Sequence, residues 1–119
     1  MTTRVKPFTC GDLREYVMDT GWRLFAELWE TEDAAVLRQH ATLFPNLIPG
    51  DAFPEYPDAI LSFVIDRHRF AVISSQGEYL FFVDDPECAK ELLLAVARHF
   101  NSLLRRVTSR GFFFFRLMP

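Results

Sequence analysis

The stretch AILSFVIDRHRFAVISSQGEYLFFVD, residues 59–84, decides the fold class of this 119-residue chain. It contains three short runs of β-branched and aromatic residues, separated by RH at 67–68 and by QG at 76–77. Runs of this kind with two-residue connections are typical of antiparallel strands joined by hairpins. The stretch therefore predicts a three-stranded antiparallel meander. Its first and third runs are apolar almost throughout, which favours burial on both faces of the sheet.

The residues that follow, 84–107, predict a long amphipathic helix. Asp85 is the expected N-cap and Pro86 the expected first helical residue, because proline suits that position. Apolar side chains form one stripe at helical spacing: Ala89, Leu92, Leu93, Val96, Phe100, Leu103, Leu104 and Val107. Residues 109–111 end this pattern.

Four adjacent phenylalanines at 112–115 predict a C-terminal strand. Burying each ring stabilises the fold by about 1.5–3 kcal/mol, which favours an internal strand covered on both faces. The alternative is an edge strand or tail that pairs with a second chain.

Upstream of the meander, the sequence predicts a helical hairpin. In residues 10–30, two neighbouring apolar stripes follow helical spacing, and Gly21 interrupts them at the centre. A second helix over residues 32–44 is expected to begin after Thr31 and to stop at Pro45. Its expected inward positions are Val36, Leu37, His40, Ala41 and Phe44.

Residues 45–58, PNLIPGDAFPEYPD, hold four prolines and a glycine, so they predict no helix. Connections of this length are uncommon in small domains and are often functional. Together these patterns predict one α+β domain over residues 1–119. It would comprise the N-terminal helical hairpin, the three-stranded meander, the long amphipathic helix and the C-terminal strand, with one mainly antiparallel sheet covered by helices.

The charge distribution is uneven along the chain. All 16 acidic residues, but only eight of the 13 basic residues, precede Arg98. This acidic body argues against nucleic-acid binding, which needs a basic surface, and permits a basic or mixed protein partner. The first residues lack the apolar segment of a signal peptide, and no run approaches the ~20 apolar residues of a membrane span. We therefore expect a cytoplasmic protein without membrane association.

The sequence shows no motif for catalysis, a cofactor or a metal. The two cysteines, Cys10 and Cys88, make no metal-binding pattern, and Cys88 is expected to be a buried structural thiol. His40 and His99 fall on or beside the inward stripes of their predicted helices, where packed, hydrogen-bonded histidines are expected. These observations favour a protein that is not an enzyme.

The sequence favours a small cytosolic protein-interaction module, such as an inhibitor, immunity or chaperone-like protein. Aromatic residues dominate interface energies, so the candidate partner-binding residues are Trp22, Phe25 and Trp29 on the first predicted helix and Asp51, Phe53, Glu55 and Tyr56 in the proline-rich segment. For the tryptophan stripe, the competing interpretation is the hydrophobic core.

Two other functions are compatible with the sequence. A small-ligand-binding or sensor domain is the alternative, because an aromatic-lined α+β sheet can form a pocket. A weaker hypothesis is anion binding through Arg98, Arg105, Arg106 and Arg110, although the helix dipole alone accounts for arginines there. A homodimer is compatible with the first two functions.

Overall fold

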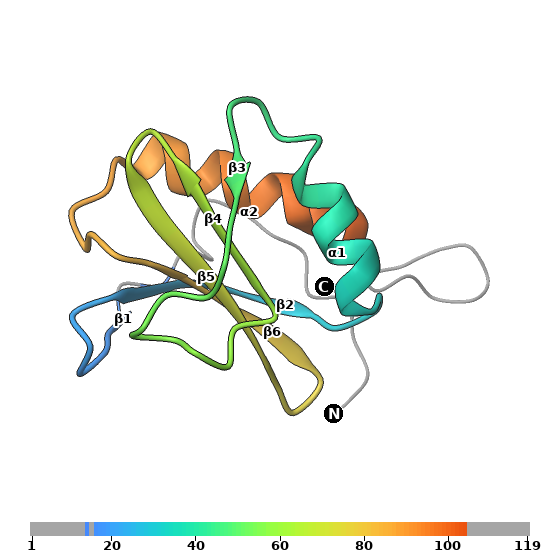
Figure 1. Ribbon diagram of the computed structural model, residues 1–119, viewed down its shortest axis with the longest axis horizontal. Coiled ribbons are helices and arrows are strands. Elements are labelled where there is room, and N and C mark those ends of the chain that lie inside the picture. Colours follow the sequence, from blue (N-terminus) through green and yellow to red (C-terminus); the bar gives the residue numbers. More distant parts are fainter. Residues whose placement is uncertain (1–13, 15, 105–119) are drawn as a thin grey trace.

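The computed structural model describes residue 14 and residues 16–104. Its six strands form a single antiparallel sheet in the order β1-β2-β6-β5-β4-β3, accompanied by two helices (Figure 1). The strands are β1 (Tyr16–Val17), β2 (Arg23–Trp29), β3 (Ile48–Pro49), β4 (Leu61–Ile65), β5 (His68–Ser75) and β6 (Glu78–Val83), and the helices are α1 (Ala34–Ala41) and α2 (Lys90–Leu104). The edge strands β1 and β3 have only two residues each.

The predicted meander is present as β4, β5 and β6 at the centre of the sheet. Its first turn has positive φ at Asp66 (50°) and Arg67 (74°), and its second at Gln76 (52°) and Gly77 (85°). Two successive residues with positive φ match the right-handed twist of the flanking strands. The residues within each turn therefore determine how β4 is joined to β5 and β5 to β6.

The predicted N-terminal helical hairpin is wrong. Residues 16–29 form a β-hairpin, in which β1 pairs with β2 and the chain reverses at residues 18–21. Gly21 has a φ of 90°, and its amide donates to the carbonyl of Met18 at 2.9 Å. The glycine that would have weakened a helix is the residue that makes this turn.

A β-bulge explains why the strand resembled a helix. The pairing of β2 with β6 shifts between Leu24 and Ala26, which breaks the alternation of side chains. Trp22 and Leu24 consequently belong to one core cluster, whereas Phe25, Ala26 and Leu28 belong to the other. Apolar residues on two faces of an irregular strand reproduced the three- and four-residue spacings of a helix.

Both helices exist with shorter bounds than expected. The N-cap of α1 is Asp33, whose side chain accepts from the amide of Val36 at 3.0 Å, and not Thr31. The helix α2 begins at Lys90, because Asp85 caps a separate turn by accepting from the amide of Glu87 at 2.9 Å. The predicted end of this helix at 107 and the predicted strand at 112–115 lie outside the described residues.

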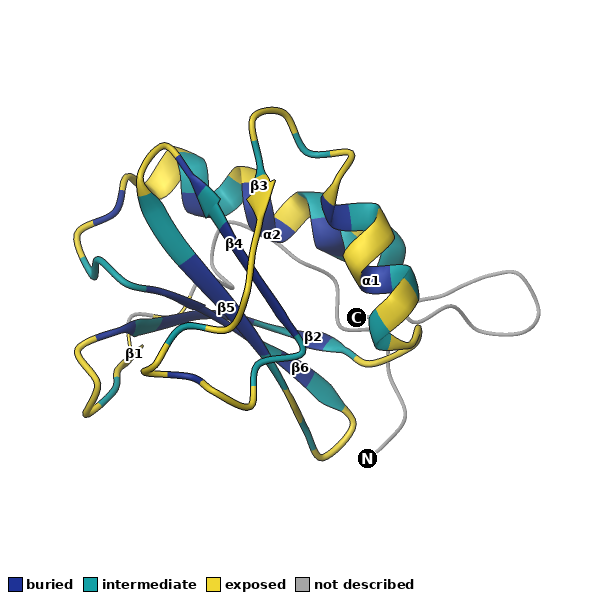
Figure 2. Ribbon diagram, in the orientation of Figure 1, coloured by how far each residue is buried: buried dark blue, intermediate teal, exposed yellow. Residues whose placement is uncertain are grey.

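The two faces of the sheet are covered differently. Both helices pack on one face, which we call the helix side, where five phenylalanines are at most 1% exposed: Phe25, Phe63, Phe70, Phe81 and Phe100. The proline-rich segment runs along the other face (Figures 1 and 2). There Tyr56 joins Trp22, Leu24, Ala71 and Phe82 in a second core. The expectation of a sheet covered by helices is therefore wrong for this face.

Neither helix in residues 16–104 has the length and apolar character that crossing a bilayer requires.

Substituting Gly21 with alanine distinguishes the hairpin from the helix. At a φ near 90° a side chain costs on the order of 1–2 kcal/mol, so Gly21→Ala should lower the free energy of unfolding in urea. In a helix the same change would raise it by about 1 kcal/mol. Gly50→Ala is the control, because its Cβ would meet no atom within 4 Å. An increase in stability for Gly21→Ala would contradict the hairpin.

Candidate partner-binding surfaces

The proline-rich segment is attached to the sheet through Tyr56. Its ring stacks on Phe82, with centroids 4.6 Å apart and 23° between planes, and meets Trp22 edge-on at 5.0 Å. The Tyr56 hydroxyl also lies 2.9 Å from the Thr20 hydroxyl, in the β1–β2 turn. These contacts join the segment to two strands that are distant in sequence. The segment is thus an ordered cover of the second face.

A second attachment, the Arg69 clamp, consists of Arg69, Trp22, Phe53, Glu55 and Asp84. The guanidinium carbon of Arg69 lies 5.1 Å from the Trp22 ring centroid and 5.2 Å from that of Phe53. Its Nε donates to Oδ2 of Asp84 at 3.1 Å, and an outer nitrogen lies 3.5 Å from Oε1 of Glu55. Cation–π attraction and two carboxylates therefore hold the Arg69 guanidinium between β5 and the proline-rich segment.

The structure places the seven candidate partner-binding residues of the two predicted sites in different surroundings. Trp22 and Tyr56 are 2% and 8% exposed and Phe25 is fully buried, so these three belong to the cores. Phe53 and Glu55 contribute to the Arg69 clamp, and Phe53 is half-buried there. The remaining two lie elsewhere: Asp51 is exposed in the segment, and Trp29 is half-buried at the end of β2.

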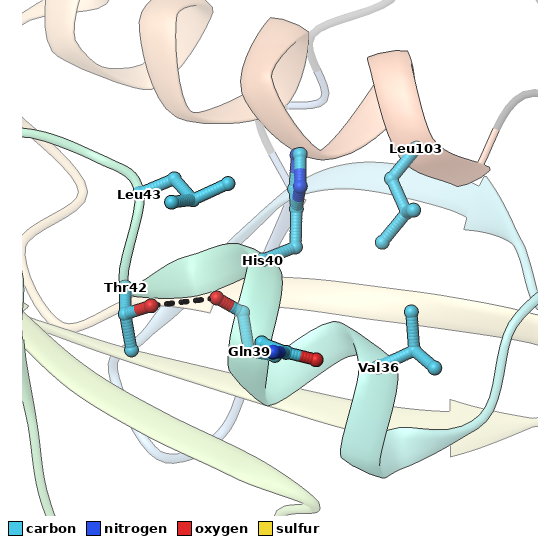
Figure 3. Close-up of a pocket in the computed structure, with 6 residues that line it drawn as sticks. All are labelled: Val36, Gln39, His40, Thr42, Leu43 and Leu103. Carbon is cyan, nitrogen blue, oxygen red and sulfur yellow. Dashed lines mark hydrogen bonds between the residues drawn. The ribbon is translucent and has the colours of Figure 1, made fainter.

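A cleft between α1 and α2 provides a different candidate surface. This helix cleft has a volume of about 340 Å³ and is lined by Val36, Gln39, His40, Thr42, Leu43 and Leu103 (Figure 3). His40 projects from α1 towards α2, with Leu43 on one side of its ring and Leu103 on the other. Leu43 is 71% exposed, the highest exposure among the large hydrophobic residues that the structure describes.

His40, which lines the helix cleft, forms a histidine pair with His99. The imidazoles of His40 and His99 stack with centroids 4.1 Å apart, and each Nε2 lies within 2.8 Å of the other residue's backbone carbonyl oxygen. The prediction of packed, hydrogen-bonded histidines is confirmed at both positions. The two reciprocal contacts fix α1 against α2, and hence the shape of the cleft.

The remaining sequence candidates lie apart from the cleft. Cys88 is buried, and burial, followed by the charges of Asp85 and Asp84, raises the pKa of its thiol to about 11. The thiol therefore stays protonated at neutral pH, as a structural cysteine does. Arg98 is exposed on α2, whereas Arg105, Arg106 and Arg110 lie outside the described residues. Residues 16–104 hold no group of three or more potential metal ligands.

Sequence reasoning missed both Leu43 and Arg69. Leu43 carried a usable signal, because it is an apolar residue outside the expected inward positions of its helix. Arg69 carried none, since its aromatic and acidic partners lie in segments distant from it in sequence.

Comparisons with protein-family models, curated proteins and solved structures gave no match for this chain.

Removing the Arg69 clamp should loosen the proline-rich segment. We expect Arg69→Ala to lower the free energy of unfolding by about 1–2 kcal/mol, because cation–π contacts and a partly shielded ion pair are lost. Arg69→Lys should retain only part of this stability, since an ammonium lacks the planar set of donors of a guanidinium. Urea unfolding followed by tryptophan fluorescence measures the change. The control Arg67→Ala, at an exposed turn residue, should have a smaller effect, and equal effects would contradict the clamp.

The histidine pair should make stability depend on pH. Burial lowers the pKa of His99 below its ordinary value of 6.5, and the neighbouring His40 imidazole adds to this shift against an opposing hydrogen bond to the His40 carbonyl. The unfolded chain therefore binds this proton first as the pH falls. The contribution of neutral His99 to the free energy of unfolding is complete above about pH 6.5. It decreases as the pH falls through the pKa of His99 in the folded protein.

Chemical unfolding between pH 5 and 8 measures this dependence. In His99→Asn the decrease in stability below pH 6.5 should be smaller than in the unmodified chain. His68→Gln, which leaves the contact between α1 and α2 intact, should retain the decrease. Identical pH profiles for the unmodified chain and His99→Asn would contradict the assignment.

Proposed function

We propose that this chain is a small cytosolic protein-interaction module, of the inhibitor, immunity or chaperone-like kind, which acts by binding a protein partner and not by catalysis. The exposed Leu43 at the rim of the helix cleft carries the proposal. A leucine that is 71% exposed beside an apolar hollow is stabilised when a further apolar surface covers it.

The helix cleft has the composition of an interface centre. Val36, Leu43 and Leu103 supply apolar surface, and Gln39, His40 and Thr42 supply the polar part of the lining. Interfaces commonly bury an apolar anchor inside a polar rim, with most of the binding energy in a few central residues. The partner that fits this cleft presents an aliphatic or aromatic side chain to the His40 ring.

The excess of acidic over basic residues before Arg98 supports a partner with a basic or mixed surface around that anchor. Complementary charge accelerates encounter and excludes acidic competitors, while the apolar cleft provides affinity. The cores and the Arg69 clamp give Trp22, Phe25, Phe53 and Tyr56 structural roles, so the proposed contact surface is centred on Leu43.

One observation favours the alternative function. The helix cleft, at about 340 Å³, falls within the ~300–1,000 Å³ range of small-molecule sites. A small-ligand-binding or sensor domain would use the same residues, with Gln39 and His40 as its polar contacts. A small molecule that raises the melting temperature of the unmodified chain but not of a Leu43 variant would favour this alternative.

A homodimer through the helix cleft remains a prediction. Leu43 of each copy could enter the cleft of the other, as a twofold interface requires. Light scattering over a range of concentrations distinguishes a dimer from a monomer that binds a different protein.

Replacing Leu43 with aspartate tests the proposal. Partners are captured by cross-linking from lysate of the native cell, identified by mass spectrometry, and titrated as purified proteins. We expect Leu43→Asp to weaken binding at least tenfold, since a charge would be buried in an apolar contact. Its free energy of unfolding should change by no more than about 0.5 kcal/mol, because the residue is exposed.

Val17→Asp is the matched control, because Val17 is 51% exposed on β1, at the sheet edge. This variant should bind the partner as the unmodified chain does. Equal affinity for Leu43→Asp and the unmodified chain would exclude the cleft as the contact surface.

A further inference from the structure

The described part of the chain ends at the helix cleft. Leu103 lines this cleft, and the next residue, Leu104, is the last residue of α2. The carbonyl oxygen of Leu104 accepts from the hydroxyl of Thr31 at 3.0 Å, which holds the end of α2 beside the loop that joins β2 to α1. Residues 105–119 therefore start at the Leu103 end of the cleft (Figure 3).

The sequence after Leu104 matches the cleft in chemical character. Residues 105–119 include the four phenylalanines at 112–115 and no acidic residue. The cleft offers the apolar side chains of Val36, Leu43 and Leu103, together with the imidazole ring of His40. Aromatic rings bury a large apolar area and pack favourably on other rings. A phenylalanine from this run is thus a side chain of the kind that would cover Leu43.

The chain is long enough for this contact. From Val36 to Leu43 the cleft follows seven residues of largely helical chain, about 10 Å at 1.5 Å per residue. Residues 105–111 span up to about 23 Å when extended, at ~3.3 Å per residue. The chain can therefore turn back after Leu104 and place residues 112–115 along the cleft as far as Leu43.

Acidic side chains surround the start of this segment. Exposed carboxylates lie on both sides of Thr31 in sequence, at Glu30, Glu32 and Asp33. Burial first, and then the charges of these carboxylates, raise the pKa of Tyr79, whose hydroxyl donates to the carbonyl oxygen of Glu32 at 2.6 Å. None of the ion pairs within the described residues involves these carboxylates. Residues 105 and 106 are both arginines, so complementary charge favours a segment that stays beside this loop.

We propose that, without a partner, the helix cleft is occupied by the C-terminal segment of the same chain, residues 105–119, with a phenylalanine of 112–115 packed against Leu43 and the His40 ring. The segment then competes with the partner for this surface, a consequence that rests on the proposed function. A tethered segment has a high effective concentration at the cleft, so a partner must displace it. The same contact withdraws apolar rings from water.

A spin label on the C-terminal segment locates it without any partner. Met118→Cys in a Cys10→Ser background carries the label, because the buried Cys88 has a thiol pKa of about 11 and stays protonated. Amide nitrogen–proton correlation spectra of the full chain are compared with the label active and chemically reduced.

The active label should remove at least half of the signal intensity of Thr42 and Leu43, which line the cleft. The signal of Thr20 should be retained, because its hydroxyl lies 2.9 Å from that of Tyr56, which covers the other face of the sheet. Undiminished signals at Thr42 and Leu43 would overturn the proposal.

Leu43→Asp should restore at least half of the lost Thr42 intensity, since a carboxylate disfavours packing of an aromatic ring. Replacing all four phenylalanines of 112–115 with serine should do the same. Val17→Asp, at an exposed residue of β1, should not. The serine variant should also unfold cooperatively and melt within a few degrees of the unmodified chain. Loss of cooperative unfolding would show that the phenylalanines belong to the core, and would overturn the proposal, as would an unrestored Thr42 signal.

Mixed samples distinguish the same chain from a second copy. Spin-labelled chain without isotope enrichment is combined with nitrogen-15-enriched chain that carries no label. The Thr42 and Leu43 signals should keep their intensity in this mixture. Their loss would assign the segment to the cleft of another copy, and would overturn docking within one chain.

The results also separate this contact from the proposed function. Undiminished cleft signals, together with weaker partner binding by Leu43→Asp, would overturn the contact and leave the proposed function supported. Diminished cleft signals with unchanged partner affinity in Leu43→Asp would support the contact and exclude the cleft as the partner surface. Where both hold, the serine variant should bind the purified partner at least fivefold more tightly, because the segment no longer occupies the cleft. Equal affinity would overturn the competition.

Discussion

The shift in pairing of β2 with β6 between Leu24 and Ala26 determines how side chains are distributed between the two faces of the sheet. Leu24 contributes to the second face and the next residue, Phe25, to the helix side; because of the bulge, Ala26 and Leu28 also belong to the helix side. A regular strand would keep a strict alternation over its length. The bulge instead adds Ala26 directly after Phe25 to the helix side, while Leu24 stays in the other core, so both faces carry apolar residues that need a cover.

The two covers differ in physical character. On the helix side, the backbone hydrogen bonds of α1 and α2 are satisfied within each helix, and side chains determine only how the helices pack. Beyond β3 and the Gly50 amide, which pair with β4, the proline-rich segment has no such internal ladder, so the position of residues 51–58 depends on Tyr56, on Phe53 and on the Arg69 clamp. Its prolines compensate in part, because they restrict the unfolded chain and reduce the entropy lost on ordering.

Prediction from sequence succeeded where structure is local and failed where it depends on distant residues. The turns of the meander, and the existence of both helices, follow from nearby residues such as Gly77 and the apolar stripe of α2. The β1–β2 hairpin was missed because the bulge imitates helical spacing, and the cover of the second face was missed because Tyr56 and Phe82 are joined only by folding. The helix cleft likewise depends on His40 meeting His99, 59 positions away.

The short edge strands limit how this sheet can grow. Long exposed edges offer backbone donors and acceptors that allow copies to join side by side into extended sheets. Here β3 ends on Pro49, which has no amide proton to donate, and β1 offers only Tyr16 and Val17. Where β1 and β3 cover the sheet, this phenylalanine-rich chain therefore offers another copy little backbone with which to extend the sheet.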